Sequence, residues 1–228
     1  MHPALTDEVG LTGVSFDLAY EDLKAAYRFG IFPVSDPGDP IGWWSPDPRW
    51  ILDPCNVNIS KSMKKIIRES LWTVTCDLDF EKVMRLCGEG RSRKDQHPSW
   101  ITEEVIVEYY RFYQDGRGHS FEVREADGEI IGGFYGIVTG NIFAGESMFA
   151  NAPNASKYAF ITACGFMASI GIKTIDCQMH SSHLESLGAF PVPRMEYLQM
   201  IKKNGFEIPQ LLGTWTEKFE RYLTEIKL

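Results

Sequence analysis

Residues 119–149 read HSFEVREADGEIIGGFYGIVTGNIFAGESMF and contain three apolar runs typical of β-strands. Asp127-Gly128 joins the first two runs, and residues 139–141, Thr-Gly-Asn, join the next pair. Asp-Gly between two such runs is a strong signal for a tight hairpin. The sequence therefore predicts an antiparallel meander of three strands, against which the rest of the chain has to pack.

Further regular elements are predicted after the meander: helices at residues 155–170, from Ser182 onward and at residues 195–203, and a strand at residues 172–178. Asn154 is placed to cap the first of these helices and Gly171 to end it. Ser182 and Glu185 have the spacing of a capping box. A meander followed by helix, strand and helix is the order of a GNAT-like α/β domain, named after the N-acetyltransferases of that fold.

The N-terminal part has a different character. Residues 20–29 carry the apolar spacing of a helix that Gly30 ends, whereas residues 31–49 contain five prolines and predict no regular element. A boundary at residues 53–58 divides the chain into a small N-terminal domain, residues 1–57, and a larger domain, residues 58–228. We therefore expect an α/β fold of the α+β type, in which a small domain accompanies a GNAT-like acyltransferase domain with a mixed, mostly antiparallel sheet.

Composition narrows the possible functions. The chain has 228 residues, a hydrophobic share of 44% and a net charge of −8, which argues against binding of nucleic acid by the whole surface. Its five cysteines form no CxxC pair, so neither a disulfide framework nor a zinc site is expected. No run approaches the ~20 apolar residues of a membrane span, and the first residues lack a signal-peptide pattern. We expect a cytoplasmic protein without a bound metal.

Two basic clusters stand out in this acidic chain. Four cations share one face of the helix that Ser60 begins, at i, i+3, i+4 and i+7: Lys61, Lys64, Lys65 and Arg68. The second cluster, predicted in a glycine-containing loop, consists of Arg85, Arg91, Arg93 and Lys94. Together they are candidates for contact with an RNA backbone, although a solvated helix face is the usual explanation of such a pattern.

A glycine motif needs a separate interpretation. RLCGEG at residues 85–90 fits the R-x-x-G-x-G pattern of coenzyme A pyrophosphate loops. Such a loop follows a strand and opens a helix, so that backbone N–H groups meet the phosphates. Here a predicted helix precedes the motif and a polar segment follows it, so the match is interpreted as chance. The turn before residue 155 also lacks a glycine-rich loop, and coenzyme A is not expected as a cofactor.

Polar residues interrupt two of the predicted strands. Asp176 and Gln178 lie two apart in TIDCQ and are expected on one face, with Glu146 at the end of a neighbouring strand facing the same cleft. Alternatively, Asp176 pairs locally and Glu146 bridges to an arginine. Apolar residues around these positions predict an apolar pocket: Phe134, Phe143, Met148, Phe160 and Ile175.

Several of these motifs occur together in one known family. GESMF at 145–149, NASK at 154–157, IDCQ at 175–178 and SLGA at 186–189, together with YRFGIFP at 27–33 and GWWSPDPR at 42–49, resemble the leucyl/phenylalanyl-tRNA protein transferases. The resemblance runs from about Tyr20 to Lys203 in the family's order. Covering nearly the whole chain, it is far more specific than any single short motif.

The resemblance implies transfer of leucine or phenylalanine from aminoacyl-tRNA to the α-amine of proteins with N-terminal Arg or Lys, which marks them for degradation under the N-end rule. It implies Asp176 and Gln178 as catalytic residues that face the amine and the ester, with Glu146 beside them. Trp44 and Trp100 become candidate substrate-binding residues, with packing between domains as the other interpretation of Trp44. A monomer without a cofactor or a membrane partner is expected. A GNAT-type N-acetyltransferase and a non-catalytic module that binds tRNA or peptides are the alternatives.

Overall fold

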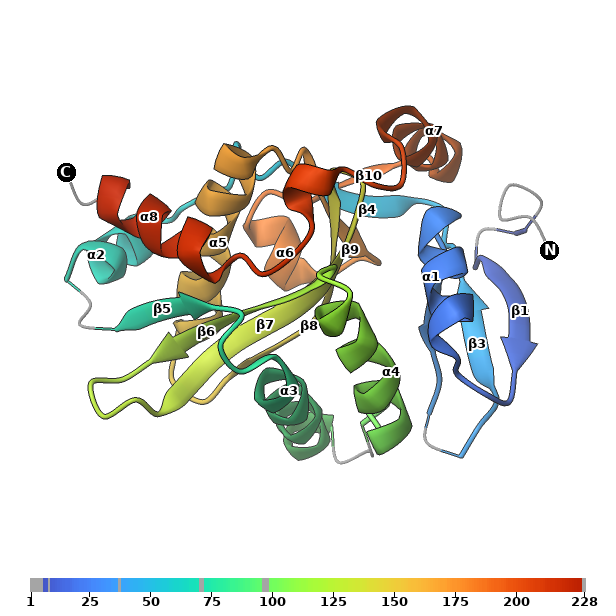
Figure 1. Cartoon of the computed structure of the whole chain (residues 1–228), viewed down its shortest axis with the longest axis horizontal. Helices are drawn as coiled ribbons and strands as arrows, with labels where there is room; N and C mark the ends of the chain where they lie inside the picture. The colour runs from blue at the N-terminus through green and yellow to red at the C-terminus, as the bar shows by residue number, and fades with distance from the viewer. Residues whose placement is uncertain (1–5, 8, 37, 70–71, 96–98, 227–228) are drawn as a thin grey trace.

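The computed structural model describes residues 6–7, 9–36, 38–69, 72–95 and 99–226, without the side chains of residues 90–95 and 204. Two sheets organise this part of the chain (Figure 1). The larger sheet has seven strands in the order β10-β4-β9-β8-β7-β6-β5, and the smaller has three in the order β1-β3-β2. The fold is thus a mixed α/β fold with a small N-terminal sheet, which confirms the expected fold class.

The predicted meander forms the middle of the large sheet. Its strands are antiparallel: β6 (Gly118–Arg124), β7 (Ile130–Thr139) and β8 (Ile142–Ala150). The remaining strands of this sheet are β4 (Arg49–Leu52), β5 (Thr73–Cys76), β9 (Thr174–Gln178) and β10 (Phe190–Val192). Only β8 and β9 pair in parallel among the described strands, so the sheet is mixed and mostly antiparallel.

Helices cover both faces of the large sheet (Figure 1). One core contains side chains of α2 (Lys61–Glu69), α5 (Ala155–Ile170) and α8 (Thr216–Ile226). The opposite core contains side chains of α1 (Tyr20–Arg28), α3 (Phe80–Asp95) and α4 (Glu103–Gln114). The short helix α6 (Ser182–Ser186), helix α7 (Arg194–Asn204) and a 3-10 turn (Pro209–Leu211) complete the chain. Of the described helices, none has both the length and the apolar character needed to cross a membrane.

The proline-rich segment departs from the sequence prediction, because residues 31–49 contain two short strands and the start of a third. Strands β2 (Phe32–Val34) and β3 (Ile41–Trp44) pair with each other, and β1 (Leu11–Ser15) pairs with β3. Pro33 is tolerated because β2 is an edge strand, where a missing N–H costs no ladder bond. Strand β4 belongs to the large sheet, so the change of sheet falls at residues 45–48, before the boundary expected at residues 57 and 58.

Three local predictions also need correction. Helix α3 runs through Gly88 to Asp95, so the glycine-containing loop expected at residues 85–94 is helical. Asn154 precedes α5 in a left-handed conformation, with φ at 70°, and its side chain makes no capping hydrogen bond. The capping box at α6 does not form, because Ser181 precedes the helix and the Glu185 carboxylate bonds to His180 at 2.9 Å. The last two corrections concern caps that the spacing of residues indicated and that do not form.

Candidate active site

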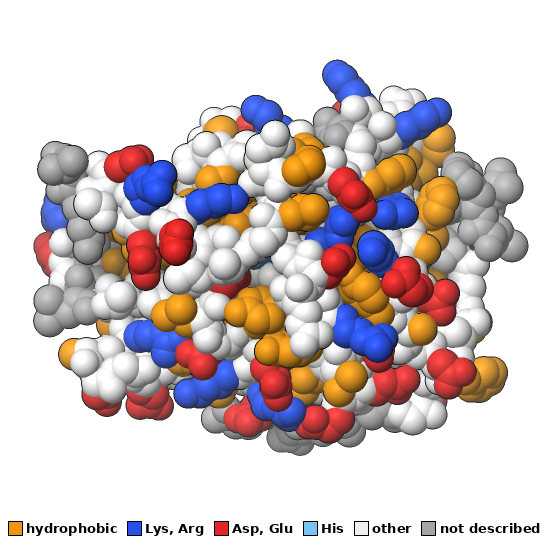
Figure 2. Space-filling model, viewed as in Figure 1, with side chains coloured by type: hydrophobic (Ala, Val, Ile, Leu, Met, Phe, Trp, Pro, Cys, Tyr) orange, Lys and Arg blue, Asp and Glu red, His pale blue; other side chains and the backbone are white. Residues whose placement is uncertain are grey.

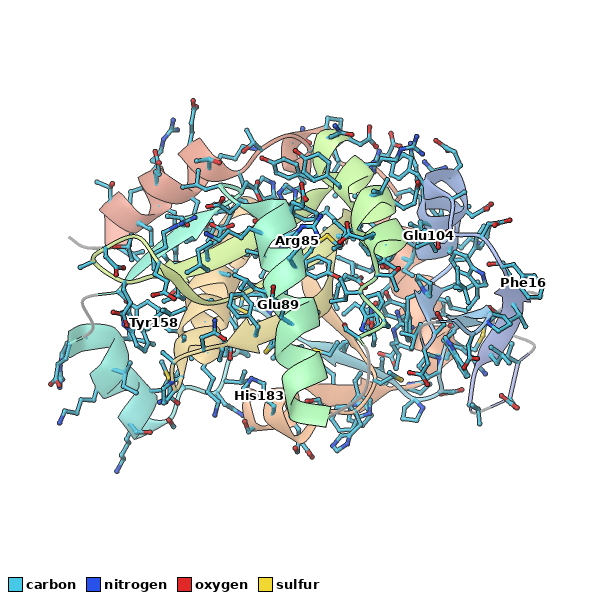
Figure 3. All side chains as sticks on the ribbon, turned by 90° about the horizontal axis from the view of Figure 1, so that it is seen from below. Phe16, Arg85, Glu89, Glu104, Tyr158 and His183 are labelled. Atoms are coloured by element: carbon cyan, nitrogen blue, oxygen red, sulfur yellow. The ribbon has the colours of Figure 1, made fainter. Side chains whose placement is uncertain are left out.

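The two parallel strands at the centre of the sheet, β8 and β9, diverge at their ends, and a cavity lies at that point. Pairing of β8 with β9 ends at Ala144 and Asp176, beyond which β8 pairs with β7 and β9 with β4. A cavity of about 500 Å³ lies beyond this point, lined by the ends of both strands, by the start of α5, by α6 and by Val34 and Trp100. Figure 3 labels His183, one of two α6 residues on its wall. Such a size suits a small organic substrate.

A β-bulge places Glu146 at the cavity. Gly136 of β7 is opposite Gly145, yet the preceding residue Tyr135 is opposite Ser147, so Glu146 is an extra residue in β8. Gly136 is required at this point, since a Cβ atom there would lie 2.2 Å from the carbonyl oxygen of Ala144. Bulges redirect side chains and are frequent beside active sites. This bulge explains how a carboxylate enters an otherwise apolar strand without facing the core.

Glu146 is held by hydrogen bonds on both sides. The Tyr27 hydroxyl donates to Glu146 Oε1 at 2.7 Å and lies 2.8 Å from the hydroxyl of Tyr109. The Gln178 side-chain amide donates to both carboxylate oxygens at 3.2 Å. Burial raises the pKa of Glu146 to about 7, against the hydrogen bonds from Tyr27 and Gln178, which lower it. Glu146 can therefore accept and release a proton near neutral pH.

Asp176 is engaged differently, because its carboxylate is buried in an ion pair. Arg49 Nε lies 2.7 Å from Oδ1 and Arg49 Nη2 lies 2.5 Å from Oδ2, while the Tyr197 hydroxyl donates to Oδ2 at 2.6 Å. The backbone N–H of Gln178 also donates to Asp176 Oδ1, at 2.9 Å. Asp176 borders the cavity, but its negative charge is compensated by Arg49. Its geometry suits positioning of Gln178 more than direct contact with an amine.

Gln178 reaches Glu146 through a special backbone conformation. It ends β9 with φ at 63°, in the left-handed region that residues with a side chain rarely adopt. Strand alternation alone, which led us to expect Asp176 and Gln178 on one face, therefore does not account for the arrangement. The hydrogen bond from its N–H to Asp176 and the pair with Glu146 hold Gln178 in this conformation.

The structure brings together most of the predicted pocket, but not all of it. The cavity lining contains four of the five expected apolar residues together with Trp100: Phe134, Met148, Phe160 and Ile175. Phe143 is not among the described lining residues. It lies before the bulge, fully buried in the core, with its ring 6.2 Å from that of Trp215. Trp44 lies in the small sheet, where its indole donates to the carbonyl of Val34 at 3.2 Å.

The basic residues fall into two groups. The four cations of α2 are exposed, as expected: Lys61, Lys64, Lys65 and Arg68. Glu69 pairs with Lys65 at 3.9 Å and with Arg68 at 3.2 Å. Arg91 and Arg93 lie in the last turns of α3, and their side chains are outside the described part of the structure. Figure 2 shows basic and acidic side chains interspersed over the face seen in Figure 1, so neither sign of charge dominates that face.

Sequence reasoning missed the residues that hold the site together: Tyr27, Arg49, Tyr109 and Tyr197. One signal was present for Arg49. An arginine in the apolar run RWIL and an aspartate in TIDCQ are opposite charges in two buried strands, and buried charges require partners. The three tyrosines carried no comparable signal, because the sequence does not show which group the hydroxyl of a helical tyrosine will bond to.

The sheet, the bulge and the cavity at the separated parallel strands place the protein in the class of GNAT-like α/β folds. FemX, a solved structure, has a TM-score of 0.51 with 9% identity, over 69% of this chain and 64% of that one, and shows likeness of fold alone. The family model for leucyl/phenylalanyl-tRNA protein transferase matches residues 51–202, and the model for its N-terminal domain matches residues 16–47.

Sequence relatives agree with both family models. A leucyl/phenylalanyl-tRNA protein transferase of Anaeromyxobacter dehalogenans (strain 2CP-C) is 43% identical over 213 residues, covering 93% of this chain and 90% of the relative. One from Laribacter hongkongensis is 44% identical over 198 residues, covering 87% and 84%. The chain belongs to the leucyl/phenylalanyl-tRNA protein transferase family and is an aminoacyltransferase.

Proposed function

We propose that the protein transfers leucine or phenylalanine from aminoacyl-tRNA to the α-amine of proteins that begin with Arg or Lys, a modification that marks them for degradation. Membership of the family supports aminoacyl transfer from tRNA to proteins. The observation that carries the finer proposal is the hydrogen-bonded pair of Glu146 and Gln178 at the wall of an apolar cavity. The cavity suits an apolar side chain, and the carboxylate suits an amine.

The proposed reaction needs one nucleophile and one proton acceptor. The neutral α-amine attacks the ester carbonyl carbon, the C–N bond forms, the ester C–O bond breaks, and the terminal ribose hydroxyl of the tRNA leaves with a proton. Glu146 accepts the proton that the amine loses and donates it to the ribose oxygen as the ester C–O bond breaks. An α-amine has a pKa of ~7.7–8.0, and a carboxylate with a pKa of about 7 is matched to it.

The protein contributes mainly alignment. The aminoacyl ester is already activated, and positioning of two reactants alone can remove ~7–11 kcal/mol of barrier. Gln178 orients the Glu146 carboxylate through its amide N–H, and its amide carbonyl is an acceptor for the incoming amine. Asp176 acts through Gln178 as a positioning residue, since it accepts the backbone N–H of Gln178 and fixes the end of β9.

Further residues have proposed roles in binding the donor. Phe134, Met148, Phe160 and Ile175 enclose the leucine or phenylalanine side chain. Trp100 lies on the same wall and is proposed to contact the aminoacyl end of the tRNA. The exposed cations of α2 are proposed to contact tRNA phosphates. The ring of Trp72, which follows α2, lies 5.9 Å from the ring of Tyr158 on α5. This contact connects the segment after α2 to the helix whose first turns line the cavity.

The test uses the purified protein, charged Leu-tRNA or Phe-tRNA, and peptides that differ only in their first residue. We expect transfer to peptides beginning with Arg or Lys and at least tenfold less to those beginning with Ala or Glu. Equal transfer to all four peptides would contradict the proposed acceptor. Acetylation from acetyl coenzyme A would favour an N-acetyltransferase, and tRNA binding without transfer would favour a binding module.

A further inference from the structure

A second cavity lies against the active-site cavity. It has a volume of about 260 Å³ and lies between the small sheet and the start of α4. Its walls come from residues 16–18, from the connection of β2 to β3 and from residues 100–105. Val34 and Trp100 line both cavities, so the two share a wall. We call this second cavity the side groove.

The side groove has a distinct electrostatic character. Among its described lining residues the charged side chains are all acidic and exposed: Asp36, Asp39 and Glu104. Glu104 Oε1 accepts the backbone N–H of Leu18 at 3.2 Å, which fixes this carboxylate to the edge of the groove. Phe16 is 84% exposed at the rim, and Figure 3 labels it together with Glu104, on the small domain and on α4 respectively.

The charge and the shape of the side groove indicate which kind of ligand it binds. Phosphates of the donor tRNA would be repelled by three carboxylates, and the cations that attract phosphates lie on α2, in another part of the fold. A cationic side chain would gain from the carboxylates and lay its apolar stem on the exposed ring of Phe16. A volume of about 260 Å³ is below the ~300–1,000 Å³ of drug-sized ligand pockets, so a short peptide segment fits better than a folded partner.

Continuity with the active site supplies the second argument. An acceptor polypeptide whose α-amine reaches Glu146 has to leave the cavity with its following residues. An extended chain advances ~3.3–3.6 Å per residue, so the second and third residues of the acceptor follow within ~7 Å of the first. Val34 and Trp100 line both cavities, so the side groove is adjacent to the active-site cavity at this wall.

We infer that the side groove binds the second and third residues of the acceptor polypeptide and selects Lys or Arg there. This inference rests on the proposed function. The selectivity is electrostatic, so it weakens as salt is added. It also differs from selection of the first residue, because Asp36, Asp39 and Glu104 line the groove and not the cavity that contains Glu146.

The experiment measures transfer of phenylalanine from Phe-tRNA to three peptides that all begin with Arg and continue with Lys-Lys, Ala-Ala or Glu-Glu. For the unmodified protein we expect kcat/KM to be about tenfold higher for Lys-Lys than for Glu-Glu, mostly through KM. In the variant Asp36→Asn/Asp39→Asn/Glu104→Gln we expect this ratio to fall to about twofold or less. Glutamine at position 104 keeps a side-chain acceptor for the N–H of Leu18.

A matched control removes the same charge elsewhere. Glu217, Glu220 and Glu225 are exposed on α8, and Glu217→Gln/Glu220→Gln/Glu225→Gln should keep the tenfold ratio. An unchanged ratio in the groove variant, or an equal fall in the control, overturns the inference. So does a groove variant that changes only the KM for Phe-tRNA, because the groove would then face the donor. Absence of transfer to every Arg-starting peptide would overturn the proposed function itself, and the inference with it.

Discussion

Arg49 of β4 and Asp176 of β9 form a bidentate ion pair in which each side chain is only 1% exposed. The guanidinium also donates to the carbonyl of Gly30 at 3.2 Å and lies 4.7 Å from the ring centroid of Phe32. The pair therefore connects the turn between α1 and β2 to the strand that ends at Gln178. Disturbing it is expected to affect both folding and the alignment of the site.

Removing one member of this pair should be costly. Asp176→Asn leaves a buried guanidinium without its counter-charge, and we expect a loss of ~3–5 kcal/mol in the free energy of unfolding. Arg49→Met/Asp176→Asn should lose less than the single variant. Urea unfolding measures both. Glu103→Gln is the control, because it breaks the ion pair with Arg85, in which the side chain of Arg85 is 41% exposed and that of Glu103 is 74% exposed. We expect it to lower the free energy of unfolding by less than ~1 kcal/mol. A small loss for Asp176→Asn would show that the pair is not tightly buried in solution.

Glu146 should make stability depend on pH. Its pKa is raised to about 7 in the folded protein, so the folded state binds more protons than the unfolded state between about pH 4.5 and 7. The stabilisation that Glu146 contributes to the folded state is fully present below pH 4.5 and is lost as the pH rises through 7. Glu146→Gln, which cannot ionise, should therefore gain stability relative to the unmodified protein as pH rises from 5 to 8. Thermal unfolding at several pH values checks this, and a parallel pH dependence of the two proteins would contradict it.

The same substitution should impair transfer to peptides without weakening the binding of aminoacyl-tRNA. Glutamine keeps the shape of the side chain but cannot accept the proton of the amine, so we expect kcat/KM for peptide transfer to fall at least 100-fold in Glu146→Gln. The affinity for aminoacyl-tRNA should stay within about twofold, because Glu146 is proposed to face the acceptor. Single-turnover transfer and tRNA binding are the measurements. Loss of tRNA binding with normal transfer at saturation would assign Glu146 to the donor instead.

Met148 should set donor selectivity. It lines the cavity beside Phe134 and Phe160, and Met148→Ala enlarges this apolar space. We expect kcat/KM for leucine transfer to fall ~10-fold or more, because a loosely filled pocket loses ~1–3 kcal/mol per methylene contact, while phenylalanine loses less. Met195→Ala is the control, since Met195 is 48% exposed on α7. An unchanged ratio of leucine to phenylalanine transfer in Met148→Ala would place the pocket elsewhere.

The cations of α2 should determine the salt dependence of tRNA binding. Lys64→Gln/Lys65→Gln removes two exposed charges and, unlike glutamate, adds no repulsion with Glu69. We expect weaker tRNA binding and a slope of log affinity against log salt that is lower by about 1–2. Lys202→Gln/Lys203→Gln on α7 is the matched control. If both variants bind tRNA equally well with equal slopes, α2 is only a solvated face.

The sequence by itself determined the local elements at the centre of the protein. Asp127-Gly128 and Gly140 fixed the two hairpins, and Gly171, with φ at 102°, ended α5 where expected. The order of these elements also determined the fold class. These features depend on residues close together in the chain, whose backbone preferences act before any tertiary contact forms.

Only the tertiary structure decided how the site is assembled. Arg49 and Asp176 are 127 residues apart, and their pairing requires β4, from the proline-rich segment, to lie beside β9. The bulge at Glu146 depends on the close approach of Gly136 to the backbone of β8, and it shifts the residues after Glu146 to the opposite face of the strand. Pattern and spacing report which face a residue prefers along one strand. They do not give the register between strands that lie far apart in the chain, nor the position of a bulge, and a one-residue shift in register moves every following side chain to the other face.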